Sequence, residues 1–298
     1  MGVTLAFASM LFFGSNILIS RLAMARMSVE LGFIIVLLVN IVTAGAVFAV
    51  ECLFRETPFV WHSKEAAIFA ISGLAGTYLG RRFMFDMVRV LGPARSSVVH
   101  SAAPAFTLFF AWLLVGERLG RYELMLMALV ILGLWFTQPA EKGASAEHRP
   151  SGASLRRGIF LGLATVIGFS LGNVFRGYAM RTWNEAVFGT IIASVAALVC
   201  VLATTRDWPA AWRGIAAADR TGIWLYVGCG VATAGGAMFL VSAMHFMEIS
   251  LAVLVTHTTP LMIFPVSLFV FHNREGLNRR TALGAAMVLA GIGLLAVR

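Results

Sequence analysis

Residues 104–136 read PAFTLFFAWLLVGERLGRYELMLMALVILGLWF, two apolar runs joined by a short charged loop. Residues 260–297 follow the same plan, as PLMIFPVSLFVFHNREGLNRRTALGAAMVLAGIGLLAV. If the two prolines are aligned and two extra residues are allowed before the second loop, identical residues fall in register. The matching pairs are Glu117 with Glu275, Leu119 with Leu277, Arg121 with Arg279 and Gly133 with Gly291. This match indicates a duplicated unit.

The composition places both copies in a membrane. The chain has 298 residues, of which 59% are hydrophobic and 12% charged, whereas about a quarter of the residues in a soluble domain are charged. Several apolar runs reach the roughly 18 residues that predict a membrane-spanning helix. The sequence therefore predicts an all-α polytopic membrane protein with ten transmembrane helices. We place them at 3–23, 31–50, 66–85, 92–115, 121–138, 158–179, 186–204, 222–244, 250–271 and 281–297.

The longest polar connection divides these helices into two sets of five. It reads PAEKGASAEHRPSGASLRRG and is rich in Gly, Pro, Ser and Ala, a composition typical of linkers. We therefore expect a first five-helix repeat at 1–138, a linker loop at 139–157 and a second repeat at 158–298. Because each unit has an odd number of crossings, the second copy enters the membrane inverted. Inverted repeats are typical of secondary transporters, whose solute site lies between the two halves.

A family resemblance rests on the same residues. Each half has a proline in its fourth helix, followed by GERL at 116–119 in the first half and the less faithful REGL at 274–277 in the second. With ten helices in two sets of five, the chain resembles the drug/metabolite transporter superfamily, specifically its EamA-type group. The resemblance implies a ten-helix basket with a central cavity lined by both halves. It also implies transport or export of a small metabolite across a membrane, which we expect to be the bacterial inner membrane.

Two histidines are the leading candidates for the solute site. His100 and His257 lie three or four residues before Pro104 and Pro260, and ionisable side chains at membrane depth usually face a cavity or a partner. Pro104 and Pro260 are expected to kink their helices, because proline has no backbone donor. The alternative is that the two histidines only form hydrogen bonds between helices.

Other polar residues extend this predicted site. The remaining candidate substrate-binding residues are Asn16, Asn173, Tyr78, Arg81, Thr256 and Thr258. The two asparagines occupy matching places in the first helix of each half, where an amide either contacts solute or joins helices. Arg81 lies about one turn beyond Tyr78 and either holds an anionic group or extends toward the lipid headgroups. Arg176, close to the predicted end of its helix, is expected to extend toward the headgroups.

The absence of certain residues and motifs limits the classes of substrate and partner that we expect. No predicted span carries an Asp or Glu in its middle, so a zwitterionic or anionic solute, such as an amino acid, is favoured over a cation. The three cysteines form no cluster with histidine, and no nucleotide-binding fingerprint occurs, so we expect no metal and no cofactor. The expected partners are a small-molecule substrate and the lipid bilayer, without nucleic acid. A coupled proton or counter-solute, and a monomeric or homodimeric state, remain open.

Two alternative functions are open at this point. Residues 168–172 read GFSLG and match the G-x-S-x-G motif of serine hydrolases. An intramembrane hydrolase using Ser170 as nucleophile would require a histidine such as His257 or His100 within reach. The other alternative to a carrier is a passive channel.

The orientation is also open. With ten spans both termini lie on one face, and the loops of the opposite face carry more Lys and Arg. The positive-inside rule would then place the termini outside the cell, whereas the family resemblance implies cytoplasmic termini.

Overall fold

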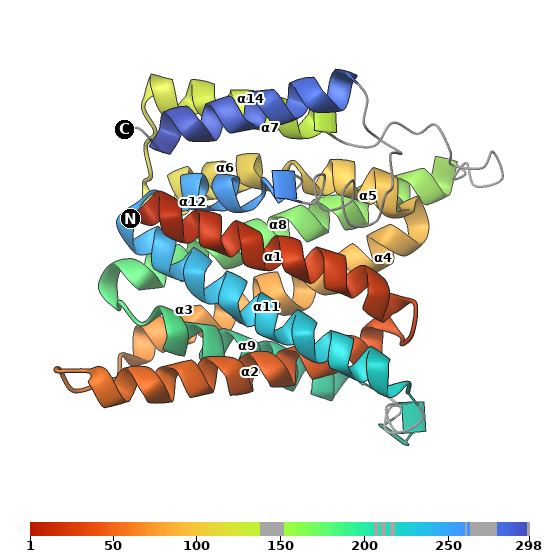
Figure 1. The fold of residues 1–298 in the computed structure, drawn as a ribbon, viewed down its shortest axis with the longest axis vertical. Coiled ribbons are helices and arrows are strands. Elements are labelled where there is room, and N and C mark those ends of the chain that lie inside the picture. Colours follow the sequence, from red (N-terminus) through yellow and green to blue (C-terminus); the bar gives the residue numbers. More distant parts are fainter. Residues whose placement is uncertain are drawn as a thin grey trace.

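The protein is an all-helical bundle in every part that the structure describes (Figure 1). The computed structural model describes residues 1–137, 152–205, 208–209, 213–214, 218–259, 261–262 and 279–296. Most of the predicted linker therefore lies outside the described residues. Six of the described helices are long and apolar enough to cross a membrane.

Five spans belong to each repeat, which confirms the predicted ten-helix architecture. The first two spans of the first repeat are α1 (Gly2–Met24) and α2 (Val29–Phe54). Its third span consists of α3 (Ser63–Ser72), η1 (Gly73–Gly80) and α4 (Arg81–Leu91). Its fourth span consists of α5 (Pro93–His100) and α6 (Ala103–Val115), and its fifth span is α7 (Arg121–Thr137). The second repeat comprises α8 (Gly152–Thr182), α9 (Ala186–Thr204), α11 (Arg220–Phe246), α12 (Ile249–Thr256) and α14 (Arg279–Ala296). In Figure 1, α1 starts at the side where both termini lie and α8 starts at the opposite side. The two repeats are therefore inverted, and we call the side of the termini the terminal face.

Two glycines and one aspartate set helix boundaries. Gly92 and Gly116 adopt φ angles of 79° and 71°, a region in which a side chain is strained. Gly92 precedes α5, and Gly116 ends α6 at the start of the charged loop. Asp219 caps α11 by accepting a hydrogen bond of 3.2 Å from the backbone N–H of Thr221. The hydrogen-bonded Arg26 holds the pKa of this exposed carboxyl below its usual value.

The fourth span of the first repeat was predicted as one helix over 92–115, but it is interrupted in its middle. Helix α5 ends at His100, and α6 begins at Ala103 with Pro104 in its first turn. Pro104 has no N–H and cannot donate to the carbonyl of His100, four residues earlier. In the second repeat α12 ends at Thr256, and Pro260 lies outside the described residues.

The third span differs in another way from the predicted 66–85. It extends from Ser63 to Leu91, and its middle part, η1, is a π-helix. A π-helix closes its hydrogen bonds five residues apart instead of four. Spacings read from an α-helical period therefore fail across this segment.

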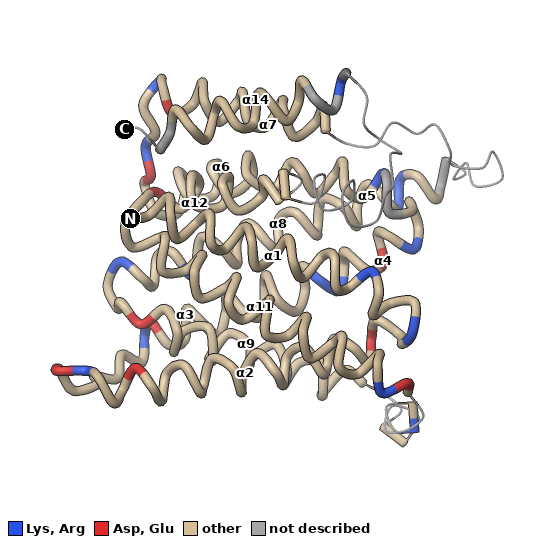
Figure 2. Tube along the Cα trace, in the orientation of Figure 1, with Lys and Arg blue, Asp and Glu red and all other residues tan. Residues whose placement is uncertain are grey.

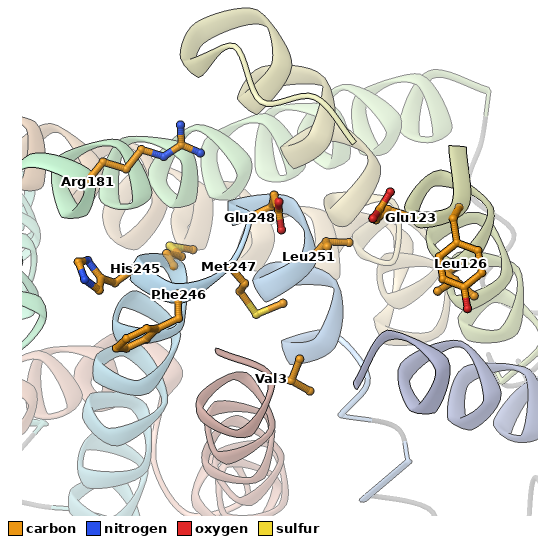
Figure 3. A pocket seen from close by; sticks show the side chains of 11 residues that line it. Val3, Glu123, Leu126, Arg181, His245, Phe246, Met247, Glu248 and Leu251 are labelled. Carbon is orange, nitrogen blue, oxygen red and sulfur yellow. The ribbon is translucent and has the colours of Figure 1, made fainter. Parts of the chain in front are cut away.

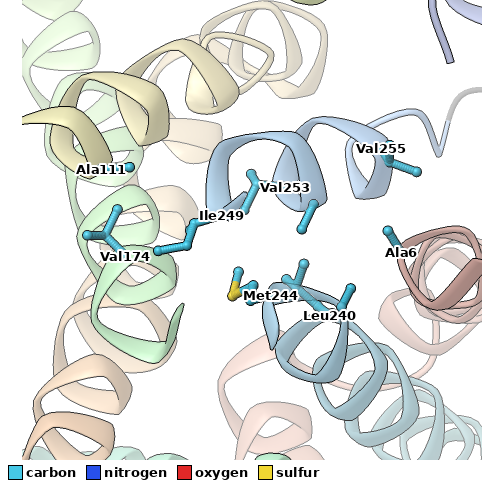
Figure 4. Close-up of a cluster of buried hydrophobic side chains, with 10 residues drawn as sticks. Ala6, Ala111, Val174, Leu240, Met244, Ile249, Val253 and Val255 are labelled. Carbon is cyan, nitrogen blue, oxygen red and sulfur yellow. The ribbon is translucent and has the colours of Figure 1, made fainter. Parts of the chain in front are cut away.

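The two repeats interleave rather than lying side by side. The first span of each packs against the third span of the other, as α1 against α11 and α8 against η1 and α4. The second spans α2 and α9 pair, and so do the fifth spans α7 and α14. Figure 4 shows one result, a buried apolar cluster in which Ala6 of α1 and Ala111 of α6 meet Val174 of α8 and Leu240 of α11. The hydrophobic core of this chain is thus largely an interface between its halves.

Close approach of η1 and α8 depends on glycines of both helices. A Cβ atom on Gly172 would lie 2.7 Å from Cα of Gly76 and 3.0 Å from the carbonyl oxygen of Ser72. One on Gly168 would lie 2.9 Å from the carbonyl oxygen of Ala75. Small residues of this kind let membrane helices pack backbone to backbone.

We expect Gly172→Ala to destabilise the protein by about 1–3 kcal/mol, because the obstructing atoms belong to the backbone of η1 and cannot rotate away. Gly45→Ala on α2 is the matched control, since a Cβ there meets nothing within 4 Å. That substitution should be neutral or slightly stabilising. Thermal unfolding in detergent would measure both, and equal effects of the two changes would contradict this packing argument.

Charged residues concentrate at the helix ends (Figure 2). At the terminal face Arg55 joins the two repeats by a bidentate contact with Glu185, at 2.7 Å for both N–O pairs. This contact raises the pKa of the Arg55 guanidinium above its already high value. On the opposite face Arg26 of the first repeat pairs with Asp219 of the second at 2.7 Å.

Candidate functional site

The two predicted histidines meet where the fourth spans are interrupted. Their ring centroids lie 5.4 Å apart, with 38° between the ring planes. His100 is the last residue of α5, and His257 directly follows α12. His100 also contacts the edge of Phe169 on α8, at 5.3 Å between centroids. The duplicated sequence thus places one imidazole from each repeat at a common centre.

Hydrogen bonding distinguishes the two rings. Nδ1 of His257 lies 2.9 Å from the carbonyl oxygen of Val253. Because a carbonyl only accepts, this nitrogen carries the proton, and a neutral His257 then offers Nε2 as an acceptor. Nδ1 of His100 is buried and has no hydrogen-bond partner among the described residues. Buried polar atoms without a partner are uncommon in folded proteins, so His100 retains capacity to bind a ligand.

Two partly buried arginines, Arg81 and Arg176, lie on the third span of the first repeat and on α8. The guanidinium of Arg81 lies 5.1 Å from the centre of the Phe33 ring, and its buried Nε has no partner in the described chain. Nη2 of Arg176 on α8 donates to Oγ1 of Thr77 on η1 at 2.7 Å. Arg81 interacts electrostatically with both Arg176 and His100. We call Arg81, His100, Arg176 and His257 the central cluster.

The central cluster lacks an acidic partner within the described residues. None of the ion pairs found there includes Arg81 or Arg176. Within the described residues the Arg81 guanidinium therefore contacts only the Phe33 ring and that of Arg176 the Thr77 hydroxyl, although burying a charge without an opposite charge beside it costs several kcal/mol. An anion that reaches the cluster would supply the missing charge through charge-assisted hydrogen bonds.

The prediction that Arg176 extends toward the headgroups is wrong. It assumed that the sixth span ends near residue 179, whereas α8 continues to Thr182. Arg176 lies six residues before this end of α8, which corresponds to about 9 Å along the helix axis. At that depth its side chain does not easily reach the lipid headgroups. Its contact with Thr77 shows that the side chain turns toward η1.

Three of the other predicted residues, Thr256, Thr258 and Tyr78, form hydrogen bonds within the protein. Thr256 and Thr258 are buried and donate to carbonyls of their own segment, Ala252 at 3.0 Å and Val255 at 2.6 Å. The hydroxyl of Tyr78 donates to Oγ1 of Thr204 at the end of α9, at 3.1 Å. Tyr78 therefore contacts α9, and among the described residues its hydroxyl forms no hydrogen bond with either imidazole.

The two asparagines lie on the first span of each repeat. Asn173 is 9% exposed and precedes Arg176 by about one turn of α8. Asn16 lies on α1, and its carbonyl oxygen is 4.0 Å from the Cys229 thiol on α11. Cys229 also interacts electrostatically with Arg81, so α11 as well as α8 borders this arginine.

The G-x-S-x-G string has a packing role. Its two glycines contact η1, and Oγ of Ser170 donates to the carbonyl oxygen of Ala103 on α6 at 3.1 Å. The Oγ atom of Ser170 in turn accepts a hydrogen bond from Oγ1 of Thr107 at 3.1 Å. Neither imidazole is a hydrogen-bond partner of Ser170 in the part of the chain that the structure describes.

We expect Ser170→Ala to leave transport nearly intact and to cost about 1 kcal/mol of stability, the usual worth of one hydrogen bond. Transport assays and thermal unfolding of the same preparation would measure both quantities. A hydrolytic activity that disappears in this variant would contradict the packing role and would support the hydrolase alternative.

Glu117 is a buried carboxylate whose role the sequence did not indicate. It lies in the loop after α6, is 4% exposed, and accepts from the backbone N–H groups of Ile249 and Ser250 at 3.1 and 3.2 Å. The Ser250 hydroxyl also donates to it, and Nη2 of Arg181 lies 3.6 Å away. A loop of the first repeat thus caps α12 of the second, the short helix that leads to His257.

These features define a class. Ten membrane helices in two inverted repeats, with broken fourth spans meeting at the centre, form the architecture of inverted-repeat membrane transporters. The model of the EamA-like transporter family matches residues 1–138 and 156–297. The chain belongs to this family, which confirms the resemblance to the EamA-type drug/metabolite transporters, and it is an integral membrane protein.

Comparison with solved structures supports the same fold. A chain described only as "Crystal structure of protein" matches with a TM-score of 0.71 and 17% sequence identity. The match covers 99% of this chain and 96% of that chain. No curated protein matches the sequence.

Proposed function

We propose that the chain is a secondary transporter, an exporter or exchanger of a small anionic or zwitterionic metabolite such as an amino acid. Solute would bind at the central cluster and reach each side by alternating access in the bacterial inner membrane. The observation that carries this proposal is that Arg81 and Arg176 have no acidic partner within the described residues, while one imidazole from each repeat meets at the centre. An anionic group satisfies those charges, whereas a simple cation would be repelled.

The cluster is asymmetric, and the asymmetry suggests how a solute is oriented. Arg81 and Arg176 would hold a carboxylate or phosphate group on the side formed by η1 and α8. Nε2 of His257 can accept a hydrogen bond from a hydroxyl or ammonium of the same solute. The remainder of the solute would face α1 and α11, where Asn16 and Cys229 lie.

Alternating access would require the contacts between repeats at the terminal face to separate. They include Arg55 with Glu185 and Glu117 with the start of α12. Breaking them costs free energy that solute binding, a proton or a counter-solute would have to offset.

The test starts with a thermal-shift screen of purified protein against anionic and zwitterionic metabolites, because a solute that binds the folded form stabilises it. The best solute is then used for counterflow in proteoliposomes. A carrier takes up labelled solute faster when unlabelled solute is present inside, and a passive channel does not. Arg21→Gln is the matched control, since Arg21 is an exposed arginine on α1. Absence of counterflow for every stabilising solute would contradict the proposal.

A further inference from the structure

A second polar site lies at the terminal face. A pocket of about 500 Å³ is formed there by the ends of α8 and α11 and the starts of α1, α7 and α12 (Figure 3). Its volume is within the usual range for small-molecule pockets. None of its lining residues belongs to the central cluster.

Two lining residues of opposite charge do not pair with each other. Arg181 of α8 lies 3.6 Å from Glu117 but makes no hydrogen bond within the described residues. Glu117 already accepts from Ile249 and Ser250, so most donors of the Arg181 guanidinium are available. Glu248 precedes α12, yet its exposed side chain neither caps that helix nor forms an ion pair in the described chain.

Apolar side chains line the pocket beside Glu248. Met247 and Leu251 lie around Glu248, and Val3 of α1 faces them (Figure 3). The pocket thus offers an anion-binding group, Arg181, and a cation-binding side on which Glu248 and Glu123 both line it, with apolar side chains beside Glu248. A ligand that carries both charges satisfies both groups at once, whereas a simple anion or cation satisfies only one.

We infer that this pocket binds a zwitterion, with its phosphate or carboxylate on Arg181 and its primary ammonium on Glu248. The pocket lies at helix ends, level with the headgroups of a bilayer. Phosphate and primary amine occur together in a phosphatidylethanolamine headgroup and in soluble phosphoethanolamine. The recognition chemistry is the same for both sources.

Phosphoethanolamine is the first probe, titrated calorimetrically into the purified full chain in detergent. Arg181→Gln and Glu248→Gln should each weaken its binding about tenfold or more, because each removes a charge-assisted hydrogen bond. The controls Arg118→Gln and Glu56→Gln remove exposed charges of the same face that do not line the pocket, and they should bind as the wild type does. Inorganic phosphate should bind more weakly than phosphoethanolamine and be insensitive to Glu248→Gln.

A second arm separates the two sources. The chain is extracted from vesicles of phosphatidylethanolamine or of phosphatidylglycerol and examined by native mass spectrometry. Retention of phosphatidylethanolamine that both pocket variants lose assigns the site to lipid, and binding of phosphoethanolamine alone assigns it to a soluble zwitterion. Wild-type affinity in Glu248→Gln, or no binding of either probe, overturns the inference. Arg81→Gln should leave binding at this pocket unchanged, which separates the pocket from the central cluster.

Discussion

Replacing Arg81 with glutamine is expected to reduce transport about 10- to 100-fold and to raise the melting temperature of the solute-free protein. Transport falls because one charged hydrogen bond to the solute, worth about 1.5–3 kcal/mol, is lost. Stability rises because the charge of Arg81 has no acidic partner in the described chain and its Nε is buried without a hydrogen bond, and removing that charge gains more than the lost contact with the Phe33 ring costs. Initial rates of counterflow and thermal unfolding without solute measure the two effects.

This prediction is distinctive because transport should fall while the melting temperature rises. Arg176→Gln should lower transport similarly but gain less stability, because it also gives up the hydrogen bond to Thr77. Arg21→Gln should change neither quantity. A clear fall in the melting temperature of Arg81→Gln, or full transport, would show that Arg81 serves the fold rather than the solute.

The second large effect is expected for Glu117→Ala, which should cost about 3 kcal/mol of stability. The substitution leaves the N–H groups of Ile249 and Ser250 without their acceptor in a buried place, and each unsatisfied buried donor costs about 1–3 kcal/mol. Glu117→Gln should lose less, since its amide oxygen still accepts. Thermal unfolding in detergent ranks the variants.

Glu56→Ala is the control for this series, because Glu56 is an exposed carboxylate at the same face. It should remain within about 0.5 kcal/mol of the wild type, as surface substitutions usually do. If Glu117→Ala were equally mild, the carboxylate would not be what holds α12 in place.

The architecture was predictable because apolar length and duplication are both visible along the chain. Runs of about 20 apolar residues define spans, and the repeated loop around Glu117 indicated two copies. The central pair was also accessible to sequence reasoning, since His100 and His257 precede prolines at nearly the same offset. The structure places their rings 5.4 Å apart.

Three features of the structure could not be predicted from the sequence, because they depend on local helix geometry or on contacts between residues far apart in the chain. The π-helical η1 has no clear signature in a glycine-rich apolar run, and the hydrogen bond of Tyr78 to Thr204 on α9 was not predicted. A boundary error of about one turn hid the inward position of Arg176. Glu117 meets its partners across 132 and 133 positions of chain, a distance at which only the folded protein shows the contact.

Interleaving of the repeats has a consequence for biosynthesis. Ser9 of α1 donates to the carbonyl oxygen of Gly236 on α11, at 2.7 Å, although more than two hundred residues are translated between them. Because α1 is synthesised long before α11, this hydrogen bond of Ser9 forms only once α11 has been inserted beside it. Each half on its own is an incomplete folding unit, and two fragments divided in the long loop should accumulate only when they are produced together.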